Sequence, residues 1–225
     1  MPTKALDFRL EFPFSMMVAA SSAGGKTYFT LQLLHNKSRI FKEEVHKIIY
    51  CYGEYQKAFD EYKETHDDII FTQDLFDVEK YYVTGKNYIV VIDDKLLEIE
   101  SKTEVQSYLT SFFTQKAHHD HLCPILLTQQ LFSKSLRTIS LNTRYLVLFR
   151  HIRDKVQIQV LNRQFLPGSP GFLSWALDDA CKVPYGFILL DFVPTTLDDF
   201  RIRNFILPTE NMKIYISNNV HMSNR

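Results

Sequence analysis

Residues 14–34, FSMMVAASSAGGKTYFTLQLL, constrain the fold of this chain more than any other stretch. An apolar strand near Ser15 to Ala20 runs into a Gly-rich turn, and an amphipathic helix begins near Lys26. Backbone N–H groups of such a turn, together with the positive end of the helix, can surround a polyphosphate. The order strand, glycine turn, helix therefore predicts a phosphate-binding loop in an α/β fold.

Within this loop, Lys26 can reach the terminal phosphates and Thr27 can ligate Mg²⁺. The other nucleotide contacts are expected from the neighbouring positions Ser21, Ser22, Ala23, Gly24, Gly25 and Tyr28. The pattern G-x-x-x-x-G-K-[ST] departs at its first glycine, where this chain has Ala20. A left-handed conformation there would cost roughly 1 to 2 kcal/mol, which one good phosphate contact could offset. The alternative is an ordinary strand-turn-helix that happens to contain GGKT.

A second motif is the continuous apolar run Tyr88 to Ile92, which ends in Asp93 and Asp94. Such a run is typical of a buried parallel strand with acids at its carboxyl end. Asp93 can hold the Mg²⁺ that bridges the β and γ phosphates, and Asp94 can orient or deprotonate the attacking water. Alternatively, Asp94 caps the helix that follows. The two motifs together predict a site for a nucleotide and Mg²⁺.

The fourth expected strand, PILLTQQ, places Thr128 and Gln129 at its carboxyl end, the edge expected to hold Lys26 and Asp93. The Gln129 amide can contact the γ phosphate or the attacking water. Beyond it lie several arginines that could complete a neighbouring subunit's site, because a planar guanidinium stabilises transition-state phosphate charge. They are Arg137, Arg144, Arg150 and Arg153.

The chain alternates strands and helices, which predicts a doubly wound, mostly parallel sheet with helices on both faces. Together with the phosphate loop and the acid-ended strand, this is the fold class of a P-loop NTPase. The strands are expected near Ser15 to Ala20, Lys47 to Tyr52, Tyr88 to Ile92, Ile125 to Thr128 and Tyr145 to Phe149. A helical apolar face at Val105, Tyr108, Leu109, Phe112 and Phe113 is assigned to the core. We expect a single domain over 1–225, with a core of about 12–168 and an extension over 169–225. That extension should comprise a helix around Trp175 and a β-hairpin made of GFILLDF and RIRNFILP.

Composition favours a soluble intracellular protein. No apolar run approaches the roughly 18 residues of a membrane span, and Asp7, Arg9 and Glu11 interrupt any signal-peptide core. The chain's 3 cysteines are odd in number and far apart, which indicates reduced structural thiols.

The segment HHDHLC, residues 118–123, could be read as metal ligands, but adjacent ligands on one short segment rarely close a site.

Charge is unevenly distributed although the net charge is zero. Residues 134–225 carry 12 basic and 7 acidic side chains. A surface facing a polyanion would lie there, among Lys134, Arg137, Arg144, Arg150, Arg153 and Lys155. A solvated face of mixed charge is the alternative.

Six segments, in order, resemble the FtsK/HerA-type genome-packaging ATPases of Polinton/Maverick elements, adintoviruses and related large DNA viruses. They are the phosphate loop with its preceding FPF, the IDD strand, FFTQKAHHDH, LLTQQLF, RTISLNTRYLVLFR and RDKVQIQVLNRQF, within residues 12–168. The resemblance implies ATP hydrolysis coupled to movement of double-stranded DNA into a capsid. It further implies a homo-oligomeric ring, a capsid portal or vertex protein as a possible partner, and action in the host-cell nucleus or at a viral assembly site.

The resemblance makes Lys26 and Thr27 the Walker A pair, Asp93 and Asp94 the Walker B acids, and Gln129 the sensor glutamine. Arg144, just before the YLVLF strand, becomes the first choice for an arginine acting across the subunit boundary. The family reading also places the His pair of HHDHLC in a loop near the active edge. Departures from the pattern are Ala20, Ala23, Asp94 and Asp120.

Two other functions fit the phosphate loop. A nucleotide-binding structural protein with a degenerate, inactive loop would suit the alanine substitutions. A small P-loop kinase should carry an Arg-rich lid and an acceptor-binding acid after an early strand, and the sequence has neither feature.

Overall fold

A computed structural model describes residues 7–151, 153, 155–204, 206–207 and 211–217. Its described strands form one nine-stranded sheet in the order β3-β2-β4-β5-β1-β6-β7-β8-β9. The strands are β1 (Met16–Ala19), β2 (Lys47–Tyr52), β3 (Ile69–Thr72), β4 (Tyr88–Asp93), β5 (Leu122–Thr128), β6 (Tyr145–Phe149), β7 (Phe187–Asp191), β8 (Ile202–Asn204) and β9 (Lys213–Ile214).

The first six strands are parallel, which confirms the predicted fold class. β1 lies between β5 and β6, with Met16 level with both Ile125 and Tyr145. The five parallel strands expected from the sequence all form, and β3 and β9 are additions. β3 is a four-residue edge strand, too short for its residues to set a clear alternation.

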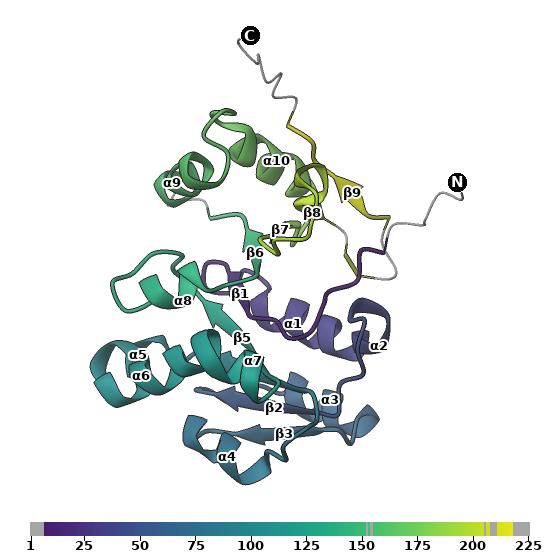
Figure 1. Ribbon diagram of the computed structural model, residues 1–225, viewed down its shortest axis with the longest axis vertical. Helices are drawn as coiled ribbons and strands as arrows, with labels where there is room; N and C mark the ends of the chain where they lie inside the picture. The colour runs from purple at the N-terminus through teal and green to yellow at the C-terminus, as the bar shows by residue number, and fades with distance from the viewer. Residues whose placement is uncertain (1–6, 152, 154, 205, 208–210, 218–225) are drawn as a thin grey trace.

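Helices cover both faces of the sheet (Figure 1). One face is covered by α1 (Lys26–His35), α2 (Lys37–Ile40) and α3 (Ala58–Thr65). The other is covered by α4 (Val78–Tyr81), α5 (Leu96–Ser101), α6 (Thr103–Ser111), α8 (Arg137–Leu141), α9 (Lys155–Phe165) and α10 (Phe172–Ala180). A π-helical segment η2 (Phe112–Lys116) joins α6 to α7 (Ala117–His119), and short 3-10 turns are η1 (Leu75–Asp77) and η3 (Asp198–Phe200).

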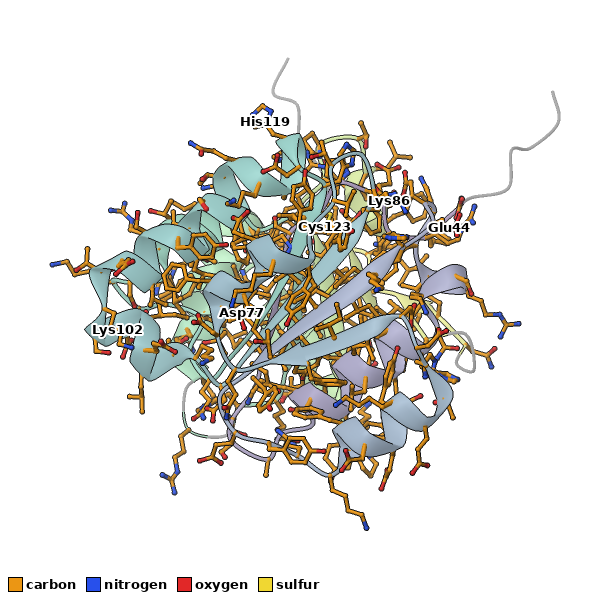
Figure 2. The ribbon with its side chains drawn as sticks, turned by 90° about the horizontal axis from the view of Figure 1, so that it is seen from below. Glu44, Asp77, Lys86, Lys102, His119 and Cys123 are labelled. Carbon is orange, nitrogen blue, oxygen red and sulfur yellow. The ribbon has the colours of Figure 1, made fainter. Side chains whose placement is uncertain are left out.

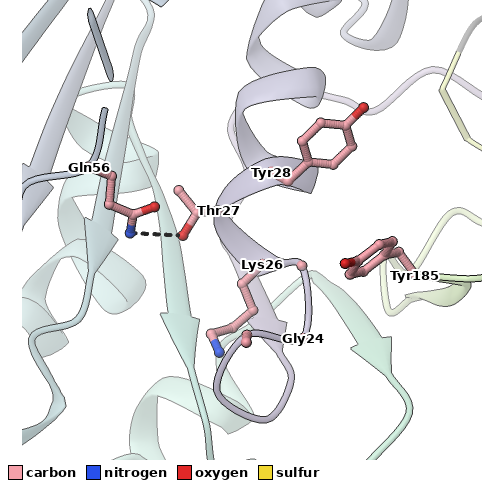
Figure 3. A pocket seen from close by; sticks show the side chains of 8 residues that line it. Gly24, Lys26, Thr27, Tyr28, Gln56 and Tyr185 are labelled. Carbon is pink, nitrogen blue, oxygen red and sulfur yellow. Dashed lines mark hydrogen bonds between the residues drawn. The ribbon is translucent and has the colours of Figure 1, made fainter. Parts of the chain in front are cut away.

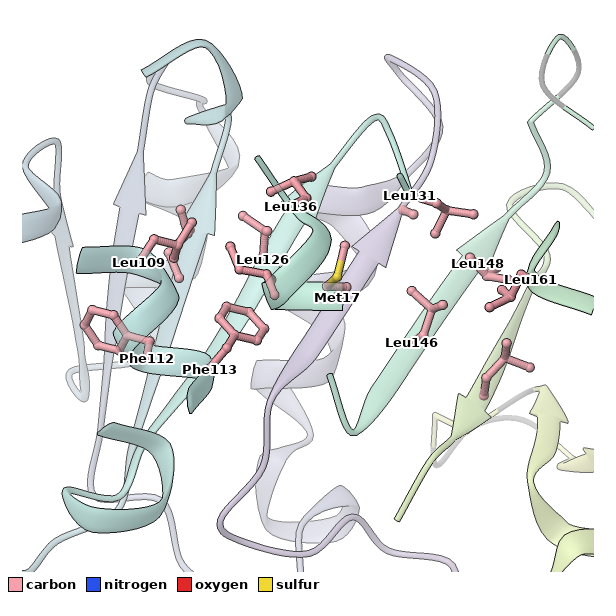
Figure 4. Close-up of a cluster of buried hydrophobic side chains, with 14 of the residues drawn as sticks. Met17, Leu109, Phe112, Phe113, Leu126, Leu131, Leu136, Leu146, Leu148 and Leu161 are labelled. Atoms are coloured by element: carbon pink, nitrogen blue, oxygen red, sulfur yellow. The ribbon is translucent and has the colours of Figure 1, made fainter. Parts of the chain in front are cut away.

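Two hydrophobic cores result, one on each face, because successive strand residues point to opposite sides of a sheet. In β1, Met17 belongs to the core under α6 and α8, whereas Met16 belongs to the core under α1. Figure 4 shows Leu109, Phe112 and Phe113 of the predicted helical face lying over the sheet. These three side chains are at most 1% exposed, as expected for core residues.

The carboxyl-terminal strands extend the same sheet. β7 is antiparallel to β6 and β8 is antiparallel to β7, so the predicted hairpin forms between β7 and β8. Residues 205 and 208 of the predicted second segment lie outside the described residues. Because β7 pairs directly with β6, this hairpin continues the main sheet and lies within reach of the elements around β1. No helix among the described residues combines the length and apolar character needed to cross a bilayer.

Candidate active site

The phosphate loop follows β1 at the carboxyl edge of the sheet and leads into α1. Gly25 stands at the N-cap of α1 with φ +94°, and no side chain caps the helix, so the first N–H groups of α1 are free to bind an anion. The Lys26 Nζ atom donates to the backbone oxygens of Ala20 and Ser21, both at 2.9 Å. The ammonium group of Lys26 is thus bound by the backbone of its own loop.

Backbone strain in this loop falls on Ala23 and not on Ala20. Ala23 has φ +55°, whereas Ala20 has no positive φ and is 2% exposed. Ala20 therefore carries none of the strain that a left-handed conformation at this position would cost. An added Cβ at Gly24 would lie 2.9 Å from the Ala20 Cβ, so the methyl group of Ala20 fills space that Gly24 leaves open.

We predict opposite stability effects for glycine at the two alanines. Ala23→Gly should raise the free energy of unfolding by about 0.5 to 1 kcal/mol, because relief of left-handed strain exceeds the added entropy of the unfolded chain. Ala20→Gly should lower it by a similar amount, since it removes a buried methyl group, and should change ATP affinity only modestly. Urea unfolding measures both. Equal effects of the two substitutions would refute this account of the loop.

Asp93 lies at the carboxyl end of β4 with 5% of its surface exposed. Its Oδ2 atom accepts hydrogen bonds from the Thr27 hydroxyl at 3.1 Å and from the buried Tyr50 hydroxyl at 2.8 Å. Burial raises the pKa of Asp93, and the hydrogen bonds from Tyr50 and Thr27 act in the opposite direction. Burial has the opposite effect on the cation and lowers the pKa of Lys26, while the charges of Asp93 and Asp94 raise it.

The donor set of Thr27 and Asp93 fits Mg²⁺. A hydroxyl and a carboxylate are hard oxygen ligands, and Mg²⁺ is held in nucleotide sites by one or two such groups together with phosphates and water. The two side chains come from α1 and β4, and their direct hydrogen bond brings both to one point beside Lys26.

Asp94 follows as the next residue and is exposed, with φ +54°. The N–H group of Gly53 donates to the Asp93 carbonyl at 2.9 Å, and a Cβ at Gly53 would lie 2.3 Å from the Asp94 carbonyl oxygen. Gly53 is therefore required for the backbone to turn here. The helix α5 has Lys95 at its N-cap and no side-chain cap, so Asp94 does not cap it.

Gln129 also lies at this edge. β5 pairs with β1, and the N–H of Ala20 donates to the Thr128 carbonyl at 3.2 Å. Gln129 is exposed and, with Ala19 and Ala20, borders a small cavity beside the phosphate loop. The structure thus brings Lys26, Thr27, Asp93, Asp94 and Gln129 to one edge of the sheet.

Arg144 lies at the opposite, amino edge. It precedes β6, and its Nη1 atom donates to the Pro13 carbonyl at 2.7 Å. Arg150 follows β6 at the carboxyl edge, with its Nε atom 3.8 Å from the Asp178 carboxylate. Of these two arginines, only Arg150 shares an edge with the phosphate loop.

The expectation that the His pair lies near the active edge is wrong. The pair, His118 and His119, ends α7 just before β5, and the carbonyl of the nearby His121 accepts from the N–H of Tyr88 at the start of β4. A loop before a parallel strand lies at the amino edge, whereas Asp93 ends a strand. Figure 2 shows His119 near the end of the molecule that carries Lys86, away from Asp77. Among the described residues, no three His, Cys, Asp or Glu side chains gather to hold a metal.

A cavity of about 530 Å³ opens at the loop. Gly24, Gly25, Lys26 and Thr27 line it together with Ala23, Tyr28, Gln56 and Tyr185 (Figure 3). Sequence reasoning missed Gln56 and Tyr185 here, and also Tyr50 and Gly53 beside Asp93. A glycine directly after the apolar strand IIYCY was a usable signal for a close backbone approach at Gly53. Nothing in the local sequence marked Tyr185.

Comparison with known proteins gives matches among solved structures only, since neither a family model nor a curated protein matches the chain. The cytoplasmic domain of the Thermomonospora curvata type VII secretion ATPase EccC overlays with a TM-score of 0.54 at 11% identity, over 91% of this chain and 25% of that one. B204, the DNA-packaging ATPase of Sulfolobus turreted icosahedral virus, overlays with a TM-score of 0.52 at 13% identity, over 92% of this chain and 98% of that one.

The fold is therefore that of P-loop ATPases, among them a viral packaging ATPase, and the resemblance seen in the sequence is confirmed at the level of the fold.

Proposed function

We propose that this chain is a motor ATPase that couples ATP hydrolysis to translocation of double-stranded viral DNA into a capsid. The observation that carries the proposal is the meeting of Lys26, Thr27, Asp93, Asp94 and Gln129 at one sheet edge around the uncapped start of α1. The shared fold of B204, a DNA-packaging ATPase, over nearly its whole length agrees with this proposal.

Each residue has a part in the proposed chemistry. The N–H groups of residues 25–27 and the Lys26 ammonium bind the phosphates and offset their charge. Thr27 and Asp93 would hold Mg²⁺, which neutralises charge on the β and γ phosphates. Asp94 orients the attacking water or accepts its proton, and Gln129 contacts the γ phosphate or that water.

The motor role also requires DNA and neighbouring subunits. We propose a homo-oligomeric ring in which Arg144 reaches the next subunit's phosphates, with duplex DNA contacted by the basic carboxyl-terminal part. In a head-to-tail ring, the surface that donates a residue differs from the surface that holds the site. The position of Arg144, at the edge away from its own Lys26, suits such a donor.

Asp94→Asn should preserve ATP binding and reduce turnover by about 10²-fold or more, because the amide cannot accept a proton. Asparagine tolerates the left-handed conformation of this position, so the backbone is retained. Equilibrium ATP binding and steady-state phosphate release separate the two effects. A variant that hydrolyses ATP at the native rate would remove Asp94 from the reaction.

The proposal is tested by the ATPase rate of the purified chain with and without duplex DNA. We expect phosphate release that depends on Lys26 and increases when duplex DNA is added. ATP binding without turnover would favour the nucleotide-binding structural protein. Transfer of the γ phosphate to a nucleoside or metabolite, with no effect of DNA, would favour the small P-loop kinase.

A further inference from the structure

The cavity at the phosphate loop has an aromatic side. Beyond the loop glycines it is bordered by the rings of Tyr28 and Tyr185, which are 66% and 67% exposed. Figure 3 shows both rings on the same side of α1, with Tyr185 reaching in from the chain between α10 and β7. Two large, mostly exposed tyrosines that line a cavity beside a phosphate loop form a surface suited to another flat, apolar group.

Tyr185 is held tightly against the loop. A Cβ added to Gly25 would lie 2.9 Å from the Tyr185 Cδ1 atom, so only glycine at position 25 lets the ring approach this closely. Tyr185 has φ +57°, a conformation that a bulky residue adopts only when its surroundings impose it.

The surroundings of Tyr185 provide that constraint. The N–H of Gly186 donates to the Val183 carbonyl at 3.1 Å, and the Cys181 thiol donates to the Gly186 carbonyl at 3.0 Å. A Cβ at Gly186 would lie 2.1 Å from the Ala180 carbonyl oxygen, so this turn is packed directly on the end of α10.

A buried aromatic cluster then joins this turn to the phosphate-binding helix. Phe187, the residue after Gly186, packs on Phe29 of α1 with ring centroids 4.7 Å apart, and Phe149 of β6 lies 5.5 Å from Phe187. Phe29 is only two residues beyond Thr27. The distance between Tyr185 and the phosphate loop is therefore fixed by packing and not by a free loop.

We propose that Tyr185, together with Tyr28, binds the nucleobase of the nucleoside triphosphate by stacking. The inference rests on the proposed nucleotide site and adds a base-binding residue from the carboxyl-terminal extension. If the phosphates of a nucleotide bind at residues 24–27, its ribose and base occupy the rest of the cavity, which Tyr28 and Tyr185 border. The cavity volume of about 530 Å³ is in the range of small-ligand sites.

Stacking on a tyrosine ring accepts any base, because every base presents a π face. Tyr185 therefore contributes affinity for nucleotides as a class, with little preference for adenine over guanine. A probe that carries the phosphates without a base separates this role from a role in shaping the loop.

Calorimetric dissociation constants for MgATP, MgGTP and Mg-tripolyphosphate test the proposal on the full chain and its variants. Tyr185→Ala should weaken ATP and GTP binding by about tenfold or more and leave tripolyphosphate binding within twofold. Tyr185→Phe keeps the ring and should bind ATP as the native chain does. Tyr81→Ala removes a partly exposed tyrosine from α4, on the other face of the sheet, and serves as the control.

Equal losses for ATP and tripolyphosphate in Tyr185→Ala would overturn the proposal, because Tyr185 would then act on the loop through Gly25. Unchanged ATP binding in Tyr185→Ala, with a native chain whose triphosphate binding depends on Lys26, would overturn this inference alone. A native chain that binds neither ATP nor tripolyphosphate would overturn the proposed function together with it.

Discussion

Replacing Lys26 with alanine is expected to abolish detectable ATP hydrolysis and to weaken ATP binding by about 10²-fold or more. The Lys26 ammonium lies in the phosphate loop, where it donates to the backbone carbonyls of Ala20 and Ser21. A phosphate bound at the loop would compete for this cation, which would offset charge on the β and γ phosphates as it develops in the transition state. Phosphate release and calorimetric ATP binding measure the two losses.

Lys102→Ala is the matched control for this substitution. Lys102 is an exposed lysine between α5 and α6 that pairs with Glu98, and its loss removes the same charge from outside the cavity at the loop. We expect native hydrolysis from Lys102→Ala and native thermal stability from both variants. A Lys26→Ala protein that hydrolyses ATP at the native rate would contradict the assigned site.

The second large effect concerns assembly. If Arg144 acts on a neighbouring subunit's phosphates, Arg144→Ala should reduce turnover by about 10³-fold while each subunit still binds ATP. The guanidinium must leave the Pro13 carbonyl to reach across the boundary, a movement of one side chain at the amino edge. Arg150→Ala, at the edge of the subunit's own site, is the comparison variant.

Mixed assemblies decide between a trans role and a local one. Arg144→Ala subunits keep Lys26, and Lys26→Ala subunits keep Arg144, so some interfaces in a mixed ring regain a complete site. Activity should return in part when the two inactive variants are combined. Assemblies shown to contain both variants that remain inactive would remove Arg144 from the trans role.

The sequence predicted the parts of this structure that depend on local patterns. Apolar runs located five parallel strands, and the glycine turn before Lys26 located the phosphate loop. Asp93 could be placed beside Thr27 because parallel strands end at a common edge, and their hydrogen bond at 3.1 Å agrees with that reasoning.

The features that sequence reasoning missed depend on tertiary contacts. Tyr185 lies about 160 positions from Gly25 in the chain and meets it only because β7 joins the sheet beside β6. The left-handed backbone at Ala23 follows from the path of the loop. No residue in AASSAGGKT predicts that this strain falls on Ala23. His118 and His119 lie at the amino edge because they precede a parallel strand, whereas the phosphate loop follows one.

The most direct test of the central claim is ATP-driven displacement of a third strand from duplex DNA. A short strand bound as a triplex at one end of a long duplex is released when a motor moves along the duplex into it. We predict release with the native chain and ATP, and none with Lys26→Ala or without nucleotide. Rapid ATP hydrolysis on the duplex with the third strand left in place would contradict DNA translocation.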